Sequence, residues 1–312
     1  MNRAISALPL AFSQEVALAR RLRTAIVALE SAVITHGLPR PHNLKLAQSL
    51  EQVVREQGVT PATAAVLDGR VHLGLSAGEL ARLAGGEPPP RKISRRDFGI
   101  ALARREMGGL TVAATLIAAR LAGIRVFATG GIGGVHRDAP FDVSADLPEL
   151  GRSPLVVVCA GAKAILDLPA TLEYLETVGV PVIGYKTDDF PAFYARSSGL
   201  PVTARADTPD EIVEIARAQW SLGLEGAVLV VQPPPEEAAL PADEVEAVVA
   251  RALEEARRAG IRGAGVTPFL LERVSRLSAG ASLNANLALL ENNARLAAQI
   301  ALALYRKETP VI

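Results

Sequence analysis

A glycine-rich stretch from Thr129 to Asp146 contains residue types that bind a phosphorylated ligand beside a metal ion. Four glycines within its first six residues would let backbone N–H groups approach an anion closely. A histidine–arginine pair follows, and then the carboxylates of Asp142 and Asp146 supply hard oxygen ligands. The spacing differs from the G-x-G-x-x-G pattern, so the stretch is not a dinucleotide-binding fingerprint. We therefore expect a site for an anionic small molecule here.

Lys163 closes the tight turn Ala160–Lys163, and the sequence predicts a helix from there to about Val178. A helix N-terminus and partial burial would both lower the pKa of the amine. A neutral amine attacks a carbonyl carbon and forms an imine. The chain has 5 lysines against 28 arginines, so a lysine beside a glycine turn is a candidate for chemistry that arginine, which keeps its proton, cannot do. The alternative is a solvated lysine in the first turn of a helix.

Glu30 ends the apolar run Ala25–Leu29 and begins a loop that contains Ser31, Thr35 and His36. A carboxyl group at the edge of an apolar core has a raised pKa and acts as an acid near neutral pH. The alternative is a structural carboxylate held by hydrogen bonds. We expect His36 to stabilise the loop through a hydrogen bond rather than to act as a ligand.

Lys92 and two aspartates are further candidates. Lys92 precedes Ser94, a predicted helix cap, and would place a point charge on a phosphate beside the helix amides; the alternative is a surface charge. Asp142 suits Mg²⁺ or Mn²⁺ better than Zn²⁺, because no cysteine–histidine cluster accompanies it. Asp146 would reach the amides of the following turn or a sugar hydroxyl if Ser144 caps that turn, and ordinary N-cap chemistry is the alternative. Amide side chains gather in one late helix and suggest a polar pocket, at Asn284, Asn286, Asn292 and Asn293.

The elements that position these residues have the pattern of an α/β protein. Apolar strands near residues 25, 63, 124, 155, 181 and 227 alternate with helices, which predicts a largely parallel sheet. The Asp68-Gly69 hairpin adds antiparallel pairing, so we expect a mixed sheet. Ligands of such sheets bind beyond the carboxyl ends of the strands. Glu30, Thr129 and Lys163 each follow a predicted strand and are therefore expected to share one crevice.

Composition excludes several classes of function. The 312 residues are 49% hydrophobic and carry a formal net charge of zero without a block of like charge, so a broad nucleic-acid-binding face is not expected. The single cysteine, Cys159, lies in an apolar run and is expected to pack in a core in a reducing compartment. No signal peptide pattern or long apolar run is visible, so we expect a soluble cytoplasmic protein without a membrane span.

Seven runs of the sequence resemble the pseudouridine-5'-phosphate glycosidase family, which is indigoidine synthase A-like. The resemblance covers nearly the whole chain in order. The runs are Val27–Ser31, Thr35–Gly37, Lys92–Asp97, Val126–Arg137, Phe141–Leu147, Val158–Lys163 and Thr267–Leu271.

The resemblance implies a fold and a reaction. It implies a single-domain α/β/α sandwich over residues 1–312, a homotrimer, and the reversible conversion of pseudouridine 5'-phosphate and water to uracil and ribose 5-phosphate. Lys163 would be the nucleophile that forms an imine with ring-opened ribose, Glu30 the proton donor, and Asp142 the ligand of Mn²⁺ or a similar ion. The residues implied to bind substrate are Lys92, Val112, Thr129, Ser144, Ala145, Asp146 and Asn286.

The sequence departs from the family pattern at few positions. The loop between His136 and Asp142 is shorter, Asp138 stands where the family has glycine, and Ala32 stands where threonine is common. Two rival functions remain open. One is an enzyme for a C-glycoside other than pseudouridine 5'-phosphate, as the relation to indigoidine synthesis suggests. The other is a non-catalytic protein that binds sugar phosphates, in which Lys163 only pairs with an anion.

Overall fold

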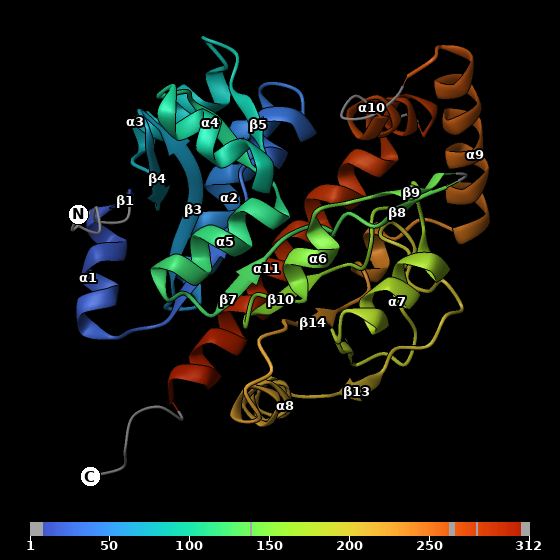
Figure 1. Cartoon of the computed structure of the whole chain (residues 1–312). Coiled ribbons are helices and arrows are strands. Elements are labelled where there is room, and N and C mark those ends of the chain that lie inside the picture. Colours follow the sequence, from blue (N-terminus) through green and yellow to red (C-terminus); the bar gives the residue numbers. More distant parts are fainter. Residues whose placement is uncertain (1–8, 138, 262–265, 279, 307–312) are drawn as a thin grey trace, which may run out of the picture.

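A mixed, largely parallel sheet of 11 strands runs through the molecule and is covered by helices on both faces (Figure 1). The computed structural model describes residues 9–137, 139–261, 266–278 and 280–306. Along the main path of the sheet the strands are β1 (Leu10–Phe12), β4 (Arg70–Leu73), β3 (Thr60–Leu67), β2 (Ile26–Leu29), β7 (Val126–Ala128), β10 (Val156–Cys159), β14 (Val228–Val231), β12 (Val182–Tyr185) and β13 (Ala204–Ala206). Off this path, β5 (Arg91–Ile93) pairs with β6 (Gly108–Leu110), which pairs with β3.

The adjacent strands β2, β7, β10 and β14 are parallel, and their residues are apolar and buried throughout. Such runs are typical of strands that are covered on both faces. The Asp68-Gly69 turn joins β3 to β4 in an antiparallel pair, as predicted, with both turn residues at positive φ. The expected mixed sheet is therefore confirmed.

Helices form the two outer layers. They are α1 (Gln14–Leu22), α2 (His42–Glu56), α3 (Ala77–Gly85), α4 (Phe98–Ala103), α5 (Val112–Ala122), α6 (Asp146–Leu150), α7 (Leu168–Thr177), α8 (Pro209–Ser221), α9 (Ala242–Arg258), α10 (Val266–Leu277) and α11 (Ala281–Arg306). Helix α11 crosses one face of the sheet and contacts β2, β7 and β10, while α5 covers β2 and β3 from the other face (Figure 1).

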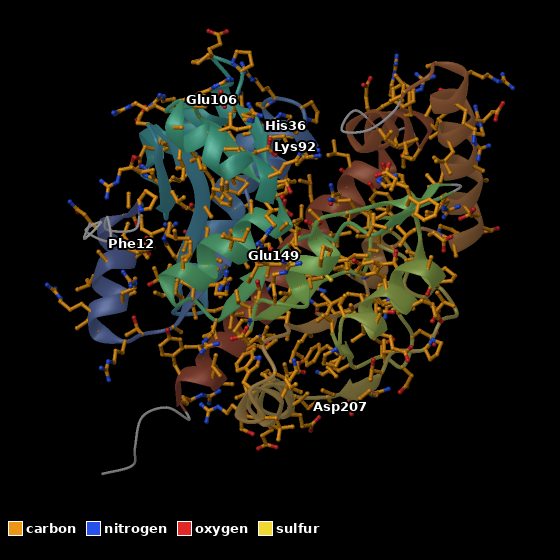
Figure 2. All side chains as sticks on the ribbon, in the orientation of Figure 1. Phe12, His36, Lys92, Glu106, Glu149 and Asp207 are labelled. Carbon is orange, nitrogen blue, oxygen red and sulfur yellow. The ribbon has the colours of Figure 1, made fainter. Side chains whose placement is uncertain are left out.

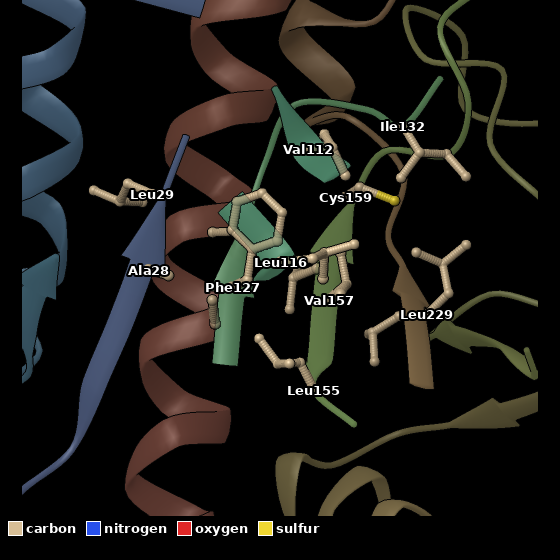
Figure 3. Packing of buried hydrophobic residues seen from close by; sticks show 14 of the residues in the cluster. Ala28, Leu29, Val112, Leu116, Phe127, Ile132, Leu155, Val157, Cys159 and Leu229 are labelled. Carbon is tan, nitrogen blue, oxygen red and sulfur yellow. The ribbon is translucent and has the colours of Figure 1, made fainter. Parts of the chain in front are cut away.

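The core lies between these layers (Figure 3). Phe127 on β7, Val157 on β10 and Leu116 on α5 are fully buried there. Cys159 is also fully buried, and this burial raises the pKa of its thiol to about 12. The thiol therefore stays protonated and acts as a small apolar side chain, in agreement with its predicted place in the core.

The structure corrects four local predictions. The predicted loop after Glu30 contains a π-helical turn, η1 (Val33–Gly37). The two glycines at 108–109 predict a helix break from the sequence, and in the structure they belong to strand β6. The stretch after Thr129 contains a hairpin, β8 (Val135–His136) and β9 (Ala139–Val143), and β8 pairs with β11 (Leu166–Asp167). These strands are too short to show a clear alternation of apolar and polar residues.

The fourth correction concerns the helix predicted to begin at Lys163. Helix α7 begins five residues later, at Leu168, because Asp167 is its N-cap and accepts a hydrogen bond from the Ala170 N–H. Pro169 in the first turn is a second start signal that the sequence carried. Lys163 is therefore in a turn between β10 and β11, and the helix-dipole argument for its reactivity does not apply.

Some sequence predictions fall on positions outside the described residues. These are Asp138 and residues 1–8. The sequence predicts a surface helix over residues 1–22, and its described part forms β1 at 10–12 and α1 at 14–22. Within the described residues, no helix is long and apolar enough to cross a membrane.

Candidate active site

A cavity of about 860 Å³ opens beyond the carboxyl ends of β2, β7 and β10. These strands lie side by side in the sheet, so the residues that follow them, Glu30, Thr129 and the turn with Lys163, meet at one edge. The crevice predicted from the sequence is therefore present. Among the residues that line the cavity are Glu30, His36, Lys92, Val112, Gly131, His136, Ser144, Ala145, Asp146, Lys163, Phe193 and Asn286.

Glu30 is nearly fully buried, with 8% of its surface exposed, and the Thr129 hydroxyl donates a hydrogen bond to its carboxyl group. Burial raises the pKa of Glu30, while the positive charge of Lys163 and the hydrogen bond from Thr129 oppose this shift. The carboxyl group is therefore poised to hold a proton at higher pH than an exposed glutamate does. Thr129 was predicted to contact substrate; it is 1% exposed, and its described side-chain contact is with Glu30.

Lys163 is held by its backbone between two parts of the cavity wall. Its N–H donates to the carbonyl of Ile132, and the N–H of Ile132 donates to the carbonyl of Gly161, both at 3.1 Å. Gly161 has a φ of +88°, and a Cβ there would lie 2.4 Å from the carbonyl oxygen of Pro191. The turn therefore requires glycine at this position, two residues before the lysine.

Arg137 binds the same turn through its side chain. Its guanidinium donates to the carbonyls of Ala164 and Leu166, each at 3.1 Å, and forms a two-point ion pair with Glu246 on α9. The cation of the 136–137 pair thus serves the turn of Lys163, and it is not among the residues that line the cavity. This corrects the expectation that the glycine-rich stretch presents its arginine to an anion.

Lys92 lies on β5 and lines the cavity, close to His36 of η1 (Figure 2). Burial lowers the pKa of Lys92, and the nearby charge of Lys163 lowers it further. Burial and the charge of Lys92 also lower the pKa of His36, whose Nδ1 lies 2.7 Å from the Thr35 hydroxyl. His36 is therefore neutral at pH 7 and keeps the predicted loop hydrogen bond, but it also lines the cavity.

Asp146, the first residue of α6, connects the start of α5 to the glycine-rich stretch. One carboxylate oxygen accepts from the N–H of Ala113 at the start of α5, and the other accepts from the N–H of Gly133, both at 2.8 Å. The Ser144 hydroxyl accepts from the N–H of Asp146 itself. The sequence predicted that Asp146 would reach the amides of the following turn or a sugar hydroxyl; the protein amides that it reaches are those of α5 and of the glycine-rich stretch.

The glycines at 130–134 serve close packing more than they present free amides. The N–H groups of Ile132 and Gly133 are already used within the protein. A Cβ on Gly131 would lie 2.6 Å from the ring of Phe193, and one on Gly133 would lie 2.2 Å from the Ser144 hydroxyl. The predicted phosphate cradle therefore lacks these N–H donors.

Gly133→Ala is expected to lower the free energy of unfolding by about 1–3 kcal/mol, because the new methyl group meets Ser144 and Asp146 in a packed wall. Urea unfolding measures this change. Gly78→Ala on α3 is the control, since a Cβ there meets nothing within 4 Å and alanine favours the helix. Equal stability of Gly133→Ala and the wild-type protein would contradict this account of the loop.

The remaining predicted binding residues divide into two groups. Val112, Ser144, Ala145 and Asn286 line the cavity, with Val112 at the first position of α5 and Asn286 on α11. Asp142 does not line it: its side chain is exposed on β9, next to a fully exposed Phe141. The structure thus brings the predicted nucleophile, acid and most binding residues together, and leaves the predicted metal ligand outside the residues that line the cavity.

The donor set limits what kind of metal ion this chain can hold. Within the described ranges, no group of three or more histidine, cysteine, aspartate or glutamate residues is placed to bind one ion. A dehydrated ion such as structural Zn²⁺ does not fit this set. A hydrated Mg²⁺ or Mn²⁺ does fit, because such an ion keeps several waters and needs only one or two carboxylates.

Several cavity residues were not singled out from the sequence. His136 was noted only as part of a charged pair, and Phe193, which has a φ of +63° and packs on Gly131, carried no signal at all. Asn293 lies outside the cavity lining; of the four asparagines predicted to form a polar pocket, it is the one whose side chain donates to the described backbone of the glycine-rich stretch, at the carbonyls of Thr129 and Gly130. The periodicity of the sequence could not show which of these residues belong to the site, because that depends on which elements pack beside them in the folded chain.

A lysine and a buried carboxyl group that converge in one cavity at the strand ends of an α/β sheet define an enzyme site. The family model described as indigoidine synthase A like protein matches residues 15–303. The chain belongs to this family.

Relatives with assigned functions extend over nearly the whole chain. A pseudouridine-5'-phosphate glycosidase from Solibacter usitatus is 54% identical over 289 residues, which cover 92% of this chain and 96% of the relative. One from Caldanaerobacter subterraneus is 50% identical over 306 residues, with 97% and 98% covered.

Two solved structures share the fold. The indigoidine synthase A-like protein of Thermotoga maritima superimposes with a TM-score of 0.89 at 35% identity and covers 98% of this chain and 100% of its own. The prealnumycin C-glycosynthase AlnA in complex with ribulose 5-phosphate also has a TM-score of 0.89, at 40% identity, with 97% and 99% covered.

Proposed function

We infer that this protein is a C-glycosidase that cleaves pseudouridine 5'-phosphate with water to uracil and ribose 5-phosphate. The observation that carries the inference is the convergence of Lys163 and Glu30 in a cavity that also contains Lys92 for an anionic group. Relatives named for this reaction are 50–54% identical over nearly the full chain. Release of uracil from pseudouridine 5'-phosphate, followed by chromatography with Mn²⁺ present, tests the inference; the absence of any uracil would refute it.

The bond to be cut joins two carbons, so no heteroatom of the leaving group carries a lone pair to protonate. The usual pair of carboxylates in glycosidases therefore fits poorly. In our proposal the Lys163 amine attacks the anomeric carbon, the ring oxygen leaves with a proton, and an open-chain sugar remains bound to nitrogen. The nitrogen lone pair then forms the imine as the carbon–carbon bond breaks, and the electron pair of the broken bond passes to the uracil ring.

Glu30 completes the proton balance. Its protonated carboxyl group gives a proton to the ring oxygen as that bond breaks, takes up the proton that the attacking nitrogen loses, and passes it to the uracil carbon as the carbon–carbon bond breaks. Water then adds to the imine, releases ribose 5-phosphate and restores the amine of Lys163. In this scheme Lys92 holds the phosphate, while Val112, Asn286 and the Ser144–Asp146 segment orient the sugar and base.

We propose that Asp142 holds a hydrated Mn²⁺ or Mg²⁺ ion through one carboxylate, and that such an ion would orient and polarise the substrate through its bound water. Activity is expected to fall after treatment with EDTA and to return with Mn²⁺. Asp142→Asn is expected to weaken Mn²⁺ binding by about 10–100-fold, measured by the electron spin resonance of the free ion. Asp243→Asn, at an exposed position on α9, is the control; full activity of metal-free enzyme would rule out an essential ion.

Arg137→Ala is expected to lower kcat by about 10–100-fold, because the turn of Lys163 loses donors to two carbonyls and the amine loses its position. Steady-state kinetics with pseudouridine 5'-phosphate measures the change. Glu246→Ala is the matched control. It removes the ion-pair partner of Arg137, which is 60% exposed on α9, and leaves the hydrogen bonds from Arg137 to the turn in place. Equal losses of kcat in the two variants would show that the ion pair matters and that the hydrogen bonds to the turn do not.

Two further expectations complete the proposal. Resemblance to the family supports a homotrimer and a cytoplasmic location, and light scattering of the 32.7 kDa chain tests the assembly. One observation supports a rival substrate class, a C-glycoside with another ring: the likeness to the prealnumycin C-glycosynthase. Comparison of kcat/KM for pseudouridine 5'-phosphate and for other aromatic C-ribosides decides between the two.

A further inference from the structure

We propose that Asn293 and Gln232 are positioning residues for Glu30, to which they are linked through the backbone and hydroxyl of Thr129. The inference rests on the proposed function, because it assigns these residues to the proton transfer of the same site. Neither side chain lines the cavity, so any effect on the reaction passes through the backbone that Asn293 contacts, at Thr129 and Gly130.

The first link is a pair of buried amides. Asn293 is 1% exposed and Gln232 is 6% exposed, and Gln232 Nε2 donates to Asn293 Oδ1 at 3.0 Å. Asn293 Nδ2 then donates to the carbonyl of Thr129 at 2.8 Å and to that of Gly130 at 3.4 Å. The two backbone carbonyls need a donor, so the amide nitrogen of Asn293 must face them and its amide oxygen must face away. Gln232 donates to that oxygen and thereby fixes this orientation of the Asn293 side chain.

The second link is Thr129 itself. Its N–H donates to the carbonyl of Val158 on β10 at 3.0 Å, and its hydroxyl donates to Glu30. The residue is therefore held on one side by the sheet and on the other by Asn293 on α11. A residue at the end of a strand has no further ladder bond to hold its carbonyl, and here the amide of Asn293 provides that contact.

This arrangement has more than a structural consequence, because it fixes the donor that stabilises the ionised form of Glu30. The charged groups that act on this carboxyl group are Lys163, Lys92 and Asp146. Asn293 is uncharged and contacts none of them in the described structure, so it changes their distances to Glu30 only indirectly. A displaced Thr129 hydroxyl weakens the hydrogen bond to the carboxylate and raises the pKa of Glu30.

Asn293→Asp tests the inference, because it keeps the shape but replaces the two N–H donors by an oxygen that faces two carbonyls. We expect kcat to fall by about 10–100-fold while KM changes less than about threefold. The limb of the pH–rate profile at which activity is lost on raising the pH should move upward by about half a unit or more. Sodium borohydride should still trap ribose 5-phosphate on Lys163, since the lysine side of the cavity is unchanged.

Asn292→Asp is the matched control. Asn292 is the neighbouring residue on α11, and its side-chain hydrogen bond within the described residues is to the carbonyl of Pro233, at 3.5 Å, so its replacement should leave the pH profile in place. Thr129→Val gives the reference shift for loss of the hydroxyl. The double variant Thr129→Val/Gln232→Leu, which adds no charge, should shift no further than Thr129→Val alone if the amide pair acts through Thr129.

The outcomes separate this inference from the proposed function. If the wild-type protein releases no uracil, the proposed function fails. If it releases uracil and the pH profile of Asn293→Asp matches that of Asn292→Asp, the positioning role is overturned. If Asn293→Asp does not fold, Gln232→Leu takes its place: it keeps the donors of Asn293 but frees their orientation. A smaller shift in the same direction supports the inference, and an unchanged profile overturns it.

Discussion

Lys163→Ala is expected to abolish the release of uracil from pseudouridine 5'-phosphate, to below the detection limit of a chromatographic assay. Within the described residues the other lysines are Lys45, Lys92 and Lys186, and of these only Lys92 lines the cavity, on β5. No other amine is held by the β10–β11 turn. Loss of a covalent nucleophile typically removes several orders of magnitude of rate, about 10⁴-fold or more.

Lys163→Arg separates the covalent role from the charge. Arginine keeps a cation in the cavity but cannot form an imine, so we expect it to bind ribose 5-phosphate without turnover. Borohydride with ribose 5-phosphate should add mass to the wild-type protein at Lys163 and none to Lys163→Arg. Lys186→Ala, which removes a lysine outside the cavity, should behave as the wild type. Ordinary turnover by Lys163→Ala would refute the imine mechanism, and binding without any adduct would favour a sugar-phosphate-binding protein.

Glu30→Gln is expected to lower kcat by about 10²–10⁴-fold, because glutamine keeps the shape and the hydrogen bond to Thr129 but cannot give a proton. Steady-state rates over pH 5–9 measure the change. Glu51→Gln is a close control, since Glu51 is also a buried glutamate that accepts from a threonine, Thr63 at 2.7 Å, but lies outside the cavity. It should lose stability through its contact with Arg55 and keep its activity. An unchanged rate in Glu30→Gln would move the proton-transfer role to another group.

The direction of the pH dependence follows from the pKa of Glu30. Burial raises this pKa, and a general acid works only while protonated, so activity should be lost as the pH rises through the raised value. For the same reason the folded state loses stability between the unfolded pKa and the raised one, because the buried carboxyl group holds its proton there and the unfolded one does not. Glu30→Gln removes this cost and should be at least as stable as the wild type at pH 7.

The order of strands in the sheet, more than any single motif, explains why the candidate site exists. Glu30 and Lys163 are 133 positions apart in the sequence, yet β2, β7 and β10 are neighbours that point the same way. Alternating apolar runs and helices predicted this sheet, and the rule that ligands bind beyond its carboxyl edge predicted the shared crevice. Local propensity failed where tertiary pairing decided, as in β8, β9 and β11, whose short segments form strands only against one another.

The sequence by itself determined the α/β class, the residues able to form an imine or give a proton, and the family to which they belong. Residue type limits chemistry directly, and apolar period limits secondary structure. Only the tertiary structure decided what each polar group faces. It paired Arg137 with the carbonyls of the Lys163 turn and Asp146 with the N–H of Gly133. It also left Asp142 outside the cavity lining and placed Asn293 against the carbonyl of Thr129. These assignments depend on contacts between residues far apart in the chain, and such contacts have no local signal in the sequence.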